Sequence, residues 1–459
     1  MTEPQTTVDL APPDAEAVRA ALERRDAEML RAWAQDEPVI LADLLAELLG
    51  RRDEAETAVA AELLGDELTA DVVAEMDPVD AADLLERLDP ADAADVLEEM
   101  APDDAADVFE ELEDAEAEEV LGAMQAEEAS ELRELLTYPP DTAGGIMTPD
   151  VAAVRPSLSV EQAIAAIRRV ADEAETVHYV YVTDDQGRLL GVLSLRDLLL
   201  ARSRQPVTAV MNPDVKSVRA TDDQEQVARL FREQRYMALP VVDERDRLVG
   251  IVTVDDVGDV LEEEATEDIE RLGGSQPLDE PYLHASVLQI VRKRIVWLLL
   301  LLVAQAYTAT VLRNYQQEIG ELVVLAIFMP MLLGIGGNVG SQTVTTLIRA
   351  VGVGDVEWTD LGRVLWKELR VALVLAVALS LGMLLRAELI GTTVDVALVV
   401  GMSAGFIVVW AGLVAAVLPL GLRRVGIDPA VVSAPLISTL VDGTGLIIYF
   451  ELARRVLGL

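Results

Sequence analysis

The C-terminal part of the chain is dominated by five long apolar runs. They occupy residues 295–312, 321–348, 369–386, 394–421 and 430–452. Each is close to or longer than the ~20 residues that an α-helix needs to cross the hydrocarbon core of a bilayer. We therefore predict an all-α transmembrane domain with five helices over residues 291–459. Because the number of spans is odd, the two ends of this domain should lie on opposite sides of the membrane.

A short helical pattern repeats in the N-terminal part of the chain. The pairs Asp77-Pro78, Asp89-Pro90 and Ala101-Pro102 recur every twelve residues, and each is followed by Ala-Ala-Asp and an apolar pair. Asp before Pro is typical of a helix N-cap followed by the first helical position. Each unit therefore predicts one short helix, whose apolar stripe is buried only when neighbours stack. Residues 1–138 are predicted to form an acidic α-helical repeat domain of the superhelical kind.

A unit of alternating strands and helices occurs twice between the repeats and the membrane. Met147-Thr148-Pro149 opens the first copy and Met211-Asn212-Pro213 opens the second. Apolar strands follow at equivalent places, over 177–182 and 238–242. This arrangement resembles a tandem pair of cystathionine-β-synthase (CBS) domains, which are α/β folds. The two domains are expected at residues 139–208 and 209–262.

The resemblance to CBS domains implies a site for an adenosine nucleotide such as ATP. In these domains a Ser or Thr and the Asp three residues later hold the ribose, which here gives Ser194 with Asp197, and Thr253 with Asp256. Tyr236 would stack on the adenine. The same residues also predict helix caps that need no ligand, because Ser194 or Thr253 can start a helix with an acid at its third position.

Charge divides the chain into two unlike parts. The whole chain carries a formal charge of -45, from 81 acidic and 36 basic side chains. Residues from 291 onward hold 11 of those acids and 13 of those bases, which leaves 70 acids and 23 bases to the preceding part. So acidic a surface repels nucleic acid and attracts cations. The chain has no cysteine, which excludes disulfides, zinc thiolates and a thiol nucleophile.

The distribution of basic residues predicts the orientation in the membrane. Residues 1–10 lack the basic and then apolar order of a signal peptide, so the acidic part is expected in the cytoplasm. With a cytoplasmic start, nine bases flank the spans on the cytoplasmic side and four on the other side, in agreement with the positive-inside rule. We expect a multi-pass protein of the cell membrane, with cytoplasmic N-terminal domains and an extracytoplasmic C-terminus.

Two of the predicted spans carry polar residues that lipid does not favour. The second contains Gly336-Gly337-Asn338-Val339-Gly340-Ser341-Gln342, in which helix packing explains the glycines but not Asn338 or Gln342. The fifth contains Asp442 with no base in the span to pair with it. An acid at the centre of a membrane helix costs about 2.5–3.5 kcal/mol, so Asp442 is a candidate for the lining of a water-filled path.

An acidic segment joins the CBS pair to the first span. Eight acids lie between Asp255 and Asp268 with no base among them. On a helix, acids four residues apart repel one another. Such a run is ordinarily a solvated face. Because this one occupies the covalent route from the acidic domains to the membrane, we predict a cation site along a connecting helix at residues 263–290.

The repeats, the CBS pair, the acidic connection, Arg292-Lys293-Arg294-Ile295-Val296-Trp297 and the Gly-Gly-Asn-Val-Gly-Ser-Gln stretch together resemble the MgtE family of magnesium channels over nearly the whole chain. The resemblance implies a Mg²⁺-selective channel that imports magnesium. It implies a homodimer whose pore runs between the second and fifth helices on the two-fold axis, with Asp442 and Asn338 at the ion. The connecting helix would be a plug, held shut when Mg²⁺ binds between the cytosolic domains.

The resemblance also implies a set of acidic residues that sense cytosolic Mg²⁺. They are Asp71, Asp103, Asp107, Asp223, Asp256, Asp259, Glu264, Glu267 and Asp268. Arg232 and Arg235 depart from the family pattern, in which small or acidic residues stand at a metal site. One sensing site is therefore in question.

Other functions fit the sequence less well. Gly401-Met402-Ser403-Ala404-Gly405 fits the nucleophile elbow of a hydrolase, but it lies in an apolar span, and the chain's two histidines are His178 and His284. We therefore expect no enzyme. A CBS-regulated secondary transporter of divalent cations (Mg²⁺, Co²⁺, Mn²⁺) is the alternative, because Asp442 alone does not distinguish a channel from an exchanger. A membrane-anchored sensor without transport would leave the buried polar residues unexplained.

Overall fold

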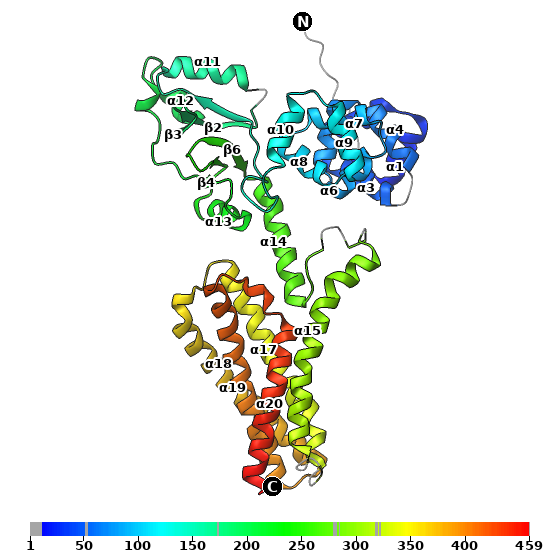
Figure 1. Ribbon diagram of the computed structural model, residues 1–459, viewed down its shortest axis with the longest axis vertical. Helices are drawn as coiled ribbons and strands as arrows, with labels where there is room; N and C mark the ends of the chain where they lie inside the picture. The colour runs from blue at the N-terminus through cyan, green and yellow to red at the C-terminus, as the bar shows by residue number, and fades with distance from the viewer. Residues whose placement is uncertain are drawn as a thin grey trace. The chain divides into compact units, whose positions relative to one another are not determined.

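The structure is a computed structural model that describes residues 12–50, 54–171, 174–278, 282–283, 285–316, 320 and 323–458. The chain divides into two compact units, Met1–Leu261 and Glu262–Leu459 (Figure 1). The first unit contains the helical repeats and the CBS pair, and the second contains the long apolar helices. His284 lies outside the described residues.

In the part of the chain that the structure describes, ten short helices make up the N-terminal portion of the first unit. They are α1 (Ala15–Arg24), α2 (Ala27–Asp36), α3 (Pro38–Gly50), α4 (Glu54–Leu64), α5 (Asp66–Ala74), α6 (Pro78–Leu85), α7 (Pro90–Glu99), α8 (Pro102–Glu111), α9 (Asp114–Ala123) and α10 (Glu128–Leu135). From α5 to α9 the helices begin twelve residues apart, so the predicted repeat is confirmed and extends by one helix on each side. The carboxylates of Asp77 and Asp89 cap α6 and α7 by accepting from Val79 N at 3.1 Å and Ala91 N at 3.3 Å.

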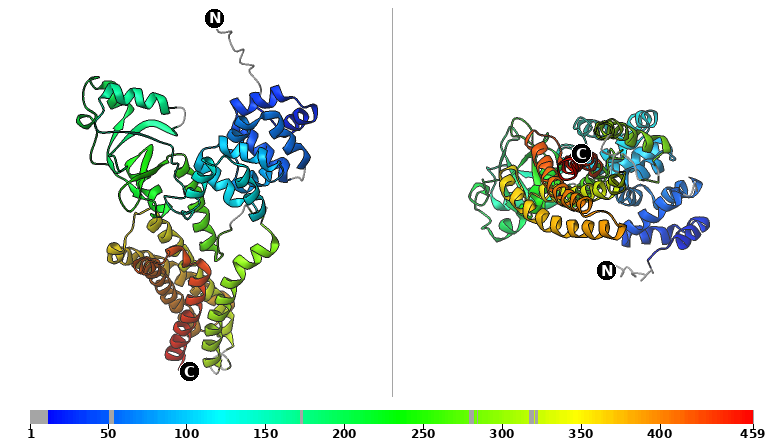
Figure 2. Two further views of the ribbon diagram at one scale, coloured as in Figure 1. Left: turned by 45° about the horizontal axis from the view of Figure 1, so that its top comes forward. Right: turned by 90° about the horizontal axis from the view of Figure 1, so that it is seen from below.

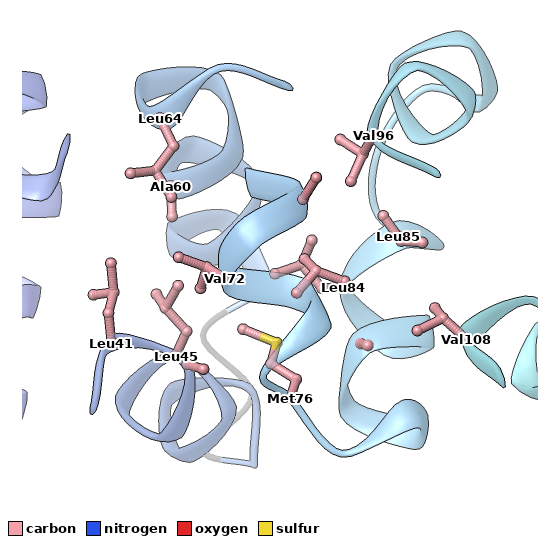
Figure 3. Packing of buried hydrophobic residues seen from close by; sticks show 14 of the residues in the cluster. Leu41, Leu45, Ala60, Leu64, Val72, Met76, Leu84, Leu85, Val96 and Val108 are labelled. Carbon is pink, nitrogen blue, oxygen red and sulfur yellow. The ribbon is translucent and has the colours of Figure 1, made fainter. Parts of the chain in front are cut away.

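Alternate helices of the repeat pack on one another, and this buries their apolar stripes. α5 contacts α7, α7 contacts α9, and α6 contacts α8. Their shared core includes Leu45, Val72, Leu84 and Val96 (Figure 3). The stacking also provides caps between repeats, because Glu86 accepts from the backbone N of Glu113 at 3.0 Å, at the start of α9.

Each CBS domain contains a three-stranded sheet. The first has β1 (Val151–Val154), α11 (Val160–Val170), β2 (Thr176–Thr183), β3 (Leu189–Ser194) and α12 (Leu195–Leu200), and the second has β4 (Val218–Arg219), α13 (Gln224–Gln234), β5 (Ala238–Val242) and β6 (Leu248–Thr253). In both, the first strand is parallel to the middle one and the last is antiparallel to it, with Val180 opposite Leu193 and Leu239 opposite Val252. The predicted internal repeat is therefore confirmed.

The Met-x-Pro segment that opens each CBS copy packs against a strand of the other copy. Thr148 pairs with Ile251 on β6, and Asn212 pairs with Val192 on β3. A methyl group on Gly250 would lie 2.8 Å from Met147 Sδ, and one on Gly191 would lie 2.8 Å from Met211 Sδ. The glycines in the two copies are therefore required by this close crossing.

The acidic connecting helix, α14 (Asp256–Gly273), begins and ends earlier than predicted. It starts inside the interval assigned to the second CBS domain and stops at Gly274, whose φ of +78° is left-handed and ends the helix. The predicted helix at 263–290 is therefore helical as far as Gly273, and the next helix begins at Val287. A capping box between Ser286 and Gln289 sets that start.

Among the described residues of the second unit, five helices are long and apolar enough to cross a membrane, which agrees with the five predicted spans. They are α15 (Val287–Asn314), α17 (Val324–Gly352), α18 (Leu361–Ile390), α19 (Val394–Arg424) and α20 (Ala434–Leu457) (Figure 2). α17 packs on α19 and α20, α18 on α19, and α20 on both α19 and α15. α20, the helix that carries Asp442, thus contacts three other spans.

Candidate functional site

The helical turn around Asp442 is held by three different helices. A methyl group on Gly336 of α17 would lie 2.7 Å from Val441 Cγ1, so α17 and α20 cross closely at this level. A methyl group on Gly443 would overlap the Tyr307 ring of α15. On the third side, Trp410 Nε1 of α19 donates to Thr444 Oγ1 at 2.8 Å. The position and rotation of this turn are therefore fixed.

Asp442 faces the sector that these contacts leave open. At 100° per residue its side chain points between that of Val441, which meets α17, and the Gly443 position, which meets α15. The carboxylate is half-buried, and no side chain in the described part of the chain bonds to it. A carboxylate without a partner at this depth requires water, an ion or a second polypeptide beside it.

The glycine-rich stretch of α17 serves the packing against α20, as the small-residue pattern predicts. A methyl group on Gly340 would lie 2.5 Å from Ile437 Cγ2, and one on Gly337 would lie 3.1 Å from Ser438 Oγ. Asn338 and Gln342 lie on another face of α17, where both are exposed. No described contact joins Asn338 to Asp442, and the two predicted pore residues lie on different helices, α17 and α20.

An acidic cluster lies where α8 meets the start of α14, within the first unit. Asp103 is 8% exposed, and its Oδ1 bonds to no described atom. Burial, followed by the charges of Asp256 and Asp104, raises the pKa of Asp103 well above its usual range. Burial and the charges of Asp256 and Glu175 likewise raise the pKa of Asp104 to about 7. A buried acceptor surrounded by other acids suits a cation.

The remaining sensing candidates of the first unit lie in more ordinary surroundings. Asp71 is on the exposed side of α5. Asp223 caps α13 by accepting from Glu225 N at 3.0 Å, so it has a structural role in this state. Asp107 and Asp259 lie on exposed faces of α8 and α14. Arg235 ends α13 with a left-handed φ of +56°, and Arg232 lies in the last turn of that helix.

The second half of α14 lies against the membrane helices of the second unit. Arg271 bonds to Glu267 one turn before it and to Asp428, which precedes α20. Burial and the charge of Asp428 raise the pKa of Asp268, while Arg271 and Arg349 oppose that rise. Glu264 lies earlier on the same helix and is half-buried. Two of the three predicted ligands in this segment are thus close to an arginine.

Over the described residues, no three Asp, Glu or His side chains converge closely enough to hold a metal ion directly. Four of the predicted ligands lie in two groups, Asp103 with Asp256 in the first unit and Glu267 with Asp268 in the second. Mg²⁺ keeps several of its waters when it binds to proteins, so carboxylates too far apart for direct coordination still suit a hydrated ion.

Of the predicted nucleotide residues, Ser194 caps α12, and Thr253 at the end of β6 bonds to the first residue of α14. Ser194 Oγ donates to Asp197 Oδ2 at 2.6 Å and accepts from the Asp197 N. Thr253 Oγ1 donates to Asp256 Oδ2 at 2.7 Å. Tyr236 is half-buried against the core of the second CBS domain. Both hydroxyls already form hydrogen bonds within the protein, so binding a ribose would require these bonds to be replaced.

Sequence reasoning missed several residues of these sites. Asp104 and Glu175 join the acidic cluster from different domains, and Trp410 and Thr444 meet although they lie 34 positions apart. Arg271 and Asp428 lie 157 positions apart. The burial of Asp103 could not be read from the helical stripe, because the equivalent residues Val79 and Ala91 of α6 and α7 are not buried, and no sequence period pairs residues on distant helices.

The motif that resembles a hydrolase elbow has no elbow geometry. Ser403 lies in the middle of α19 and is fully buried among the apolar helices. A nucleophile elbow requires a strand, a sharp turn and a helix, with the serine exposed at the turn. His178 is on β2, in the other unit. The serine is a helix-packing residue.

Comparisons with known proteins match the repeat domain, the CBS pair and most of the membrane-spanning part of the chain. Residues 329–452 match a family model described as a divalent cation transporter, residues 38–141 match the MgtE intracellular N domain, and residues 143–204 and 207–263 match CBS domains. The magnesium transporter MgtE of Thermus thermophilus is 46% identical over 327 residues, which cover 71% of this chain and 72% of that protein. The magnesium transporter MgtE of Enterococcus faecalis is 35% identical over 323 residues, covering 70% and 71%.

Solved structures resemble the first unit. The soluble part of a magnesium transporter matches with a TM-score of 0.50 and 33% identity, covering 55% of this chain and 100% of that one. The cytosolic domain of the Mg²⁺ channel MgtE, solved in complex with ATP, matches with a TM-score of 0.50 and 41% identity, covering 54% and 100%.

Proposed function

Because the chain belongs to the MgtE family of divalent cation transporters, we propose that it is a channel that imports Mg²⁺ and closes when Mg²⁺ binds to its acidic cytosolic domains. The protein is a membrane-embedded magnesium transporter and not an enzyme. The observation that carries the channel mechanism is the turn of α20 at Asp442. This turn is held by three helices, while the carboxylate itself has no partner among the described residues.

Asp442 suits a hydrated Mg²⁺ ion. Mg²⁺ loses water reluctantly, so a fixed carboxylate attracts it best through its water shell. A carboxylate held on a rigid turn does not collapse onto the ion, and this favours outer-shell contact. Selection by holding a hydrated ion lets the ion pass quickly, since no costly dehydration is required.

The pore is formed by two copies of the chain, with Asp442 and Asn338 from each. Support comes from the exposed polar face of α17, where Asn338 and Gln342 would be unfavourable beside lipid. A two-fold axis beside α17 and α20 would cover this face and bring two Asp442 carboxylates to one path. The homodimer also removes the need for a basic partner, because the permeating cation balances both acids.

Closure follows from the repulsion between buried acids. Burial raises the pKa of Asp103, Asp104 and Asp256, and the charge of Asp256 raises the pKa of the other two further, so the ionised forms favour separation of the elements that carry them. A bound Mg²⁺ turns that repulsion into a bridge and stabilises the closed arrangement. The set of sensing residues is Asp71, Asp103, Asp107, Asp223, Asp256, Asp259, Glu264, Glu267 and Asp268, with α14 as the plug.

Nucleotide binding and orientation complete the proposal. A cytosolic domain similar to this one was solved with ATP, which supports Ser194, Asp197, Tyr236 and Thr253 as contacts for ATP. The excess of bases on one side of the spans supports cytoplasmic N-terminal domains and an extracytoplasmic C-terminus in the cell membrane.

The test is Mg²⁺ flux into proteoliposomes with the internal Mg²⁺ concentration varied. We expect flux without any counter-ion gradient, inhibition by internal Mg²⁺, and loss of flux in Asp442→Ala. Flux that requires an opposing gradient of protons or sodium would instead identify a secondary transporter of divalent cations. Normal flux from Asp442→Ala would remove Asp442 from the pore.

A further inference from the structure

The contact between Trp410 and Thr444 links α19 to the turn that carries Asp442. Trp410 Nε1 donates to Thr444 Oγ1 at 2.8 Å, and the same hydroxyl donates to the backbone oxygen of Leu440 at 2.8 Å. Thr444 therefore uses its one proton within α20 and keeps a lone pair for the indole. The indole N–H can only donate, so it requires an acceptor such as this hydroxyl.

This contact acts on the side of α20 that faces away from Asp442. Two residues along a helix correspond to a rotation of 200°, so the Thr444 side chain points about 160° away from that of Asp442. The other contacts at this level are packing contacts of Gly443 with Tyr307 and of Val441 with Gly336. Packing limits how closely the helices approach. The hydrogen bond, which is directional, limits how far α20 rotates about its own axis.

The rotation of α20 decides how far the Asp442 carboxylate extends into the open sector. A hydrated ion is bound through water, so its affinity depends on the distance between the carboxylate and the ion's path. We propose that Trp410, through Thr444, is a positioning residue that sets the affinity of the Asp442 site for the permeating hydrated divalent cation. This inference rests on the proposed role of Asp442 in the pore, and it assigns to α19 a part in ion binding that α17 and α20 alone do not supply.

The test compares variants that remove the hydrogen bond with variants that keep it. Thr444→Val removes the acceptor, Trp410→Phe removes the donor, and Thr444→Ser keeps the acceptor. Thr310→Val is the matched control, because Thr310 is also an intramembrane threonine but bonds to the Ala306 carbonyl of its own helix. Mg²⁺ flux into proteoliposomes is measured over a range of external Mg²⁺, with internal Mg²⁺ kept low, together with the inhibition by internal Mg²⁺.

Loss of one hydrogen bond corresponds to a roughly two- to tenfold change in an equilibrium constant. We expect Thr444→Val and Trp410→Phe each to raise the half-saturating external Mg²⁺ by about that factor, with the half-inhibiting internal Mg²⁺ unchanged. The double variant should be no weaker than the single ones, and Thr444→Ser and Thr310→Val should behave as wild type.

Three results would overturn the inference. The first is an unchanged half-saturating concentration in Thr444→Val, and the second is additive effects in the double variant. The third is a lower maximal flux in Trp410→Phe with no change in half-saturation, which would reduce Trp410 to a structural role. Because Asp442→Ala is measured beside them, failure of the pore assignment is distinguishable: it appears as flux in Asp442→Ala, whatever the other variants do.

Discussion

Replacing Arg271 with glutamine should weaken closure of the channel. Arg271 is the cation between Glu267 on α14 and Asp428 before α20, so it attaches the connecting helix to the start of the fifth span. Leu272, the next residue, packs against the membrane core, and Asp268 lies beside the end of α17. In the proposed mechanism this docked arrangement is the closed state, and Arg271 stabilises it without any metal.

The magnitude follows from the exposure of the pair. The side chains of Arg271 and Asp428 are each 34% exposed, so the ion pair is neither fully screened nor fully desolvated. Exposed pairs contribute ~0.2–1 kcal/mol, and we take the upper end of this range, about 1 kcal/mol, because Arg271 bonds to two carboxylates. That energy corresponds to about a fivefold change in the closing equilibrium. The internal Mg²⁺ concentration that halves the flux should therefore rise about fivefold in Arg271→Gln.

The assay is proteoliposome flux titrated with internal Mg²⁺, at low and at high salt. Asp428→Asn is the partner variant: it removes the same ion pair but leaves an oxygen to accept from Ala430 N, as Asp428 does at 2.8 Å. Arg363→Gln is the control, since Arg363 pairs with Asp360 at 2.9 Å on an exposed helix start. The wild type should approach the variants as salt screens the pair. A half-inhibiting concentration in Arg271→Gln equal to or below that of wild type would refute the reasoning.

Three further outcomes are expected. Asp442→Ala should lower Mg²⁺ flux at least ~100-fold. The protein should still insert and assemble, because removing a lone intramembrane charge relieves an insertion cost. Flux assays and size-exclusion chromatography in detergent measure the two outcomes. The triple variant Asp256→Asn, Asp259→Asn, Glu267→Gln should stay open at millimolar internal Mg²⁺, because the loss of Mg²⁺ ligands outweighs the loss of repulsion between the carboxylates. Equal inhibition of variant and wild type by internal Mg²⁺ would show that the cluster is only a solvated face. Without divalent ions, the melting temperature should fall by at least ~3 °C as pH rises from about 4 to about 7. Burial raises the pKa of Asp104 from 3.8 to about 7, so across this window the folded state keeps a proton that the unfolded state loses. The stabilisation from that proton is lost as the pH rises toward 7. Asp104→Asn should reduce that fall, and an unchanged pH profile would contradict the assignment.

Local patterns in the sequence predicted most of the fold. The twelve-residue repeat, the doubled strand-helix unit and the five apolar runs each depend on neighbours in the chain, and each appears in the structure. Helix ends were predicted less well, because an apolar run marks the part of a helix in lipid and not the whole helix. α15 begins at Val287, ahead of the apolar run at 295, and the capping box of Ser286 and Gln289 that starts it was readable in the sequence.

The candidate site was predictable only where one residue alone carried the signal. Asp442 was found because an unpaired acid in an apolar span is costly wherever its helix lies. The residues that surround such acids or fix the helical turns that carry them were not found. The contacts of Trp410, Arg271 and Glu175 join different helices or domains. Such contacts depend on helix crossing angles and packing, which produce no periodic pattern in the sequence.

The counter-charge of each acid determines how much it contributes to sensing. Buried acids must be neutralised: the raised pKa of Asp104 favours its protonated form, and the guanidinium of Arg271 pairs with Glu267. An acid that already has a built-in cation gains less from Mg²⁺ than one whose neighbours are other acids. Asp256 lies among Asp103, Asp104 and Asp255, so it gains more than Glu267 does. We therefore expect Asp256→Asn to raise the half-inhibiting internal Mg²⁺ at least ~3-fold more than Glu267→Gln, a difference of under 1 kcal/mol that flux titration resolves. The reverse order would mean that Arg271 leaves Glu267 when the channel closes and that Mg²⁺ takes its place.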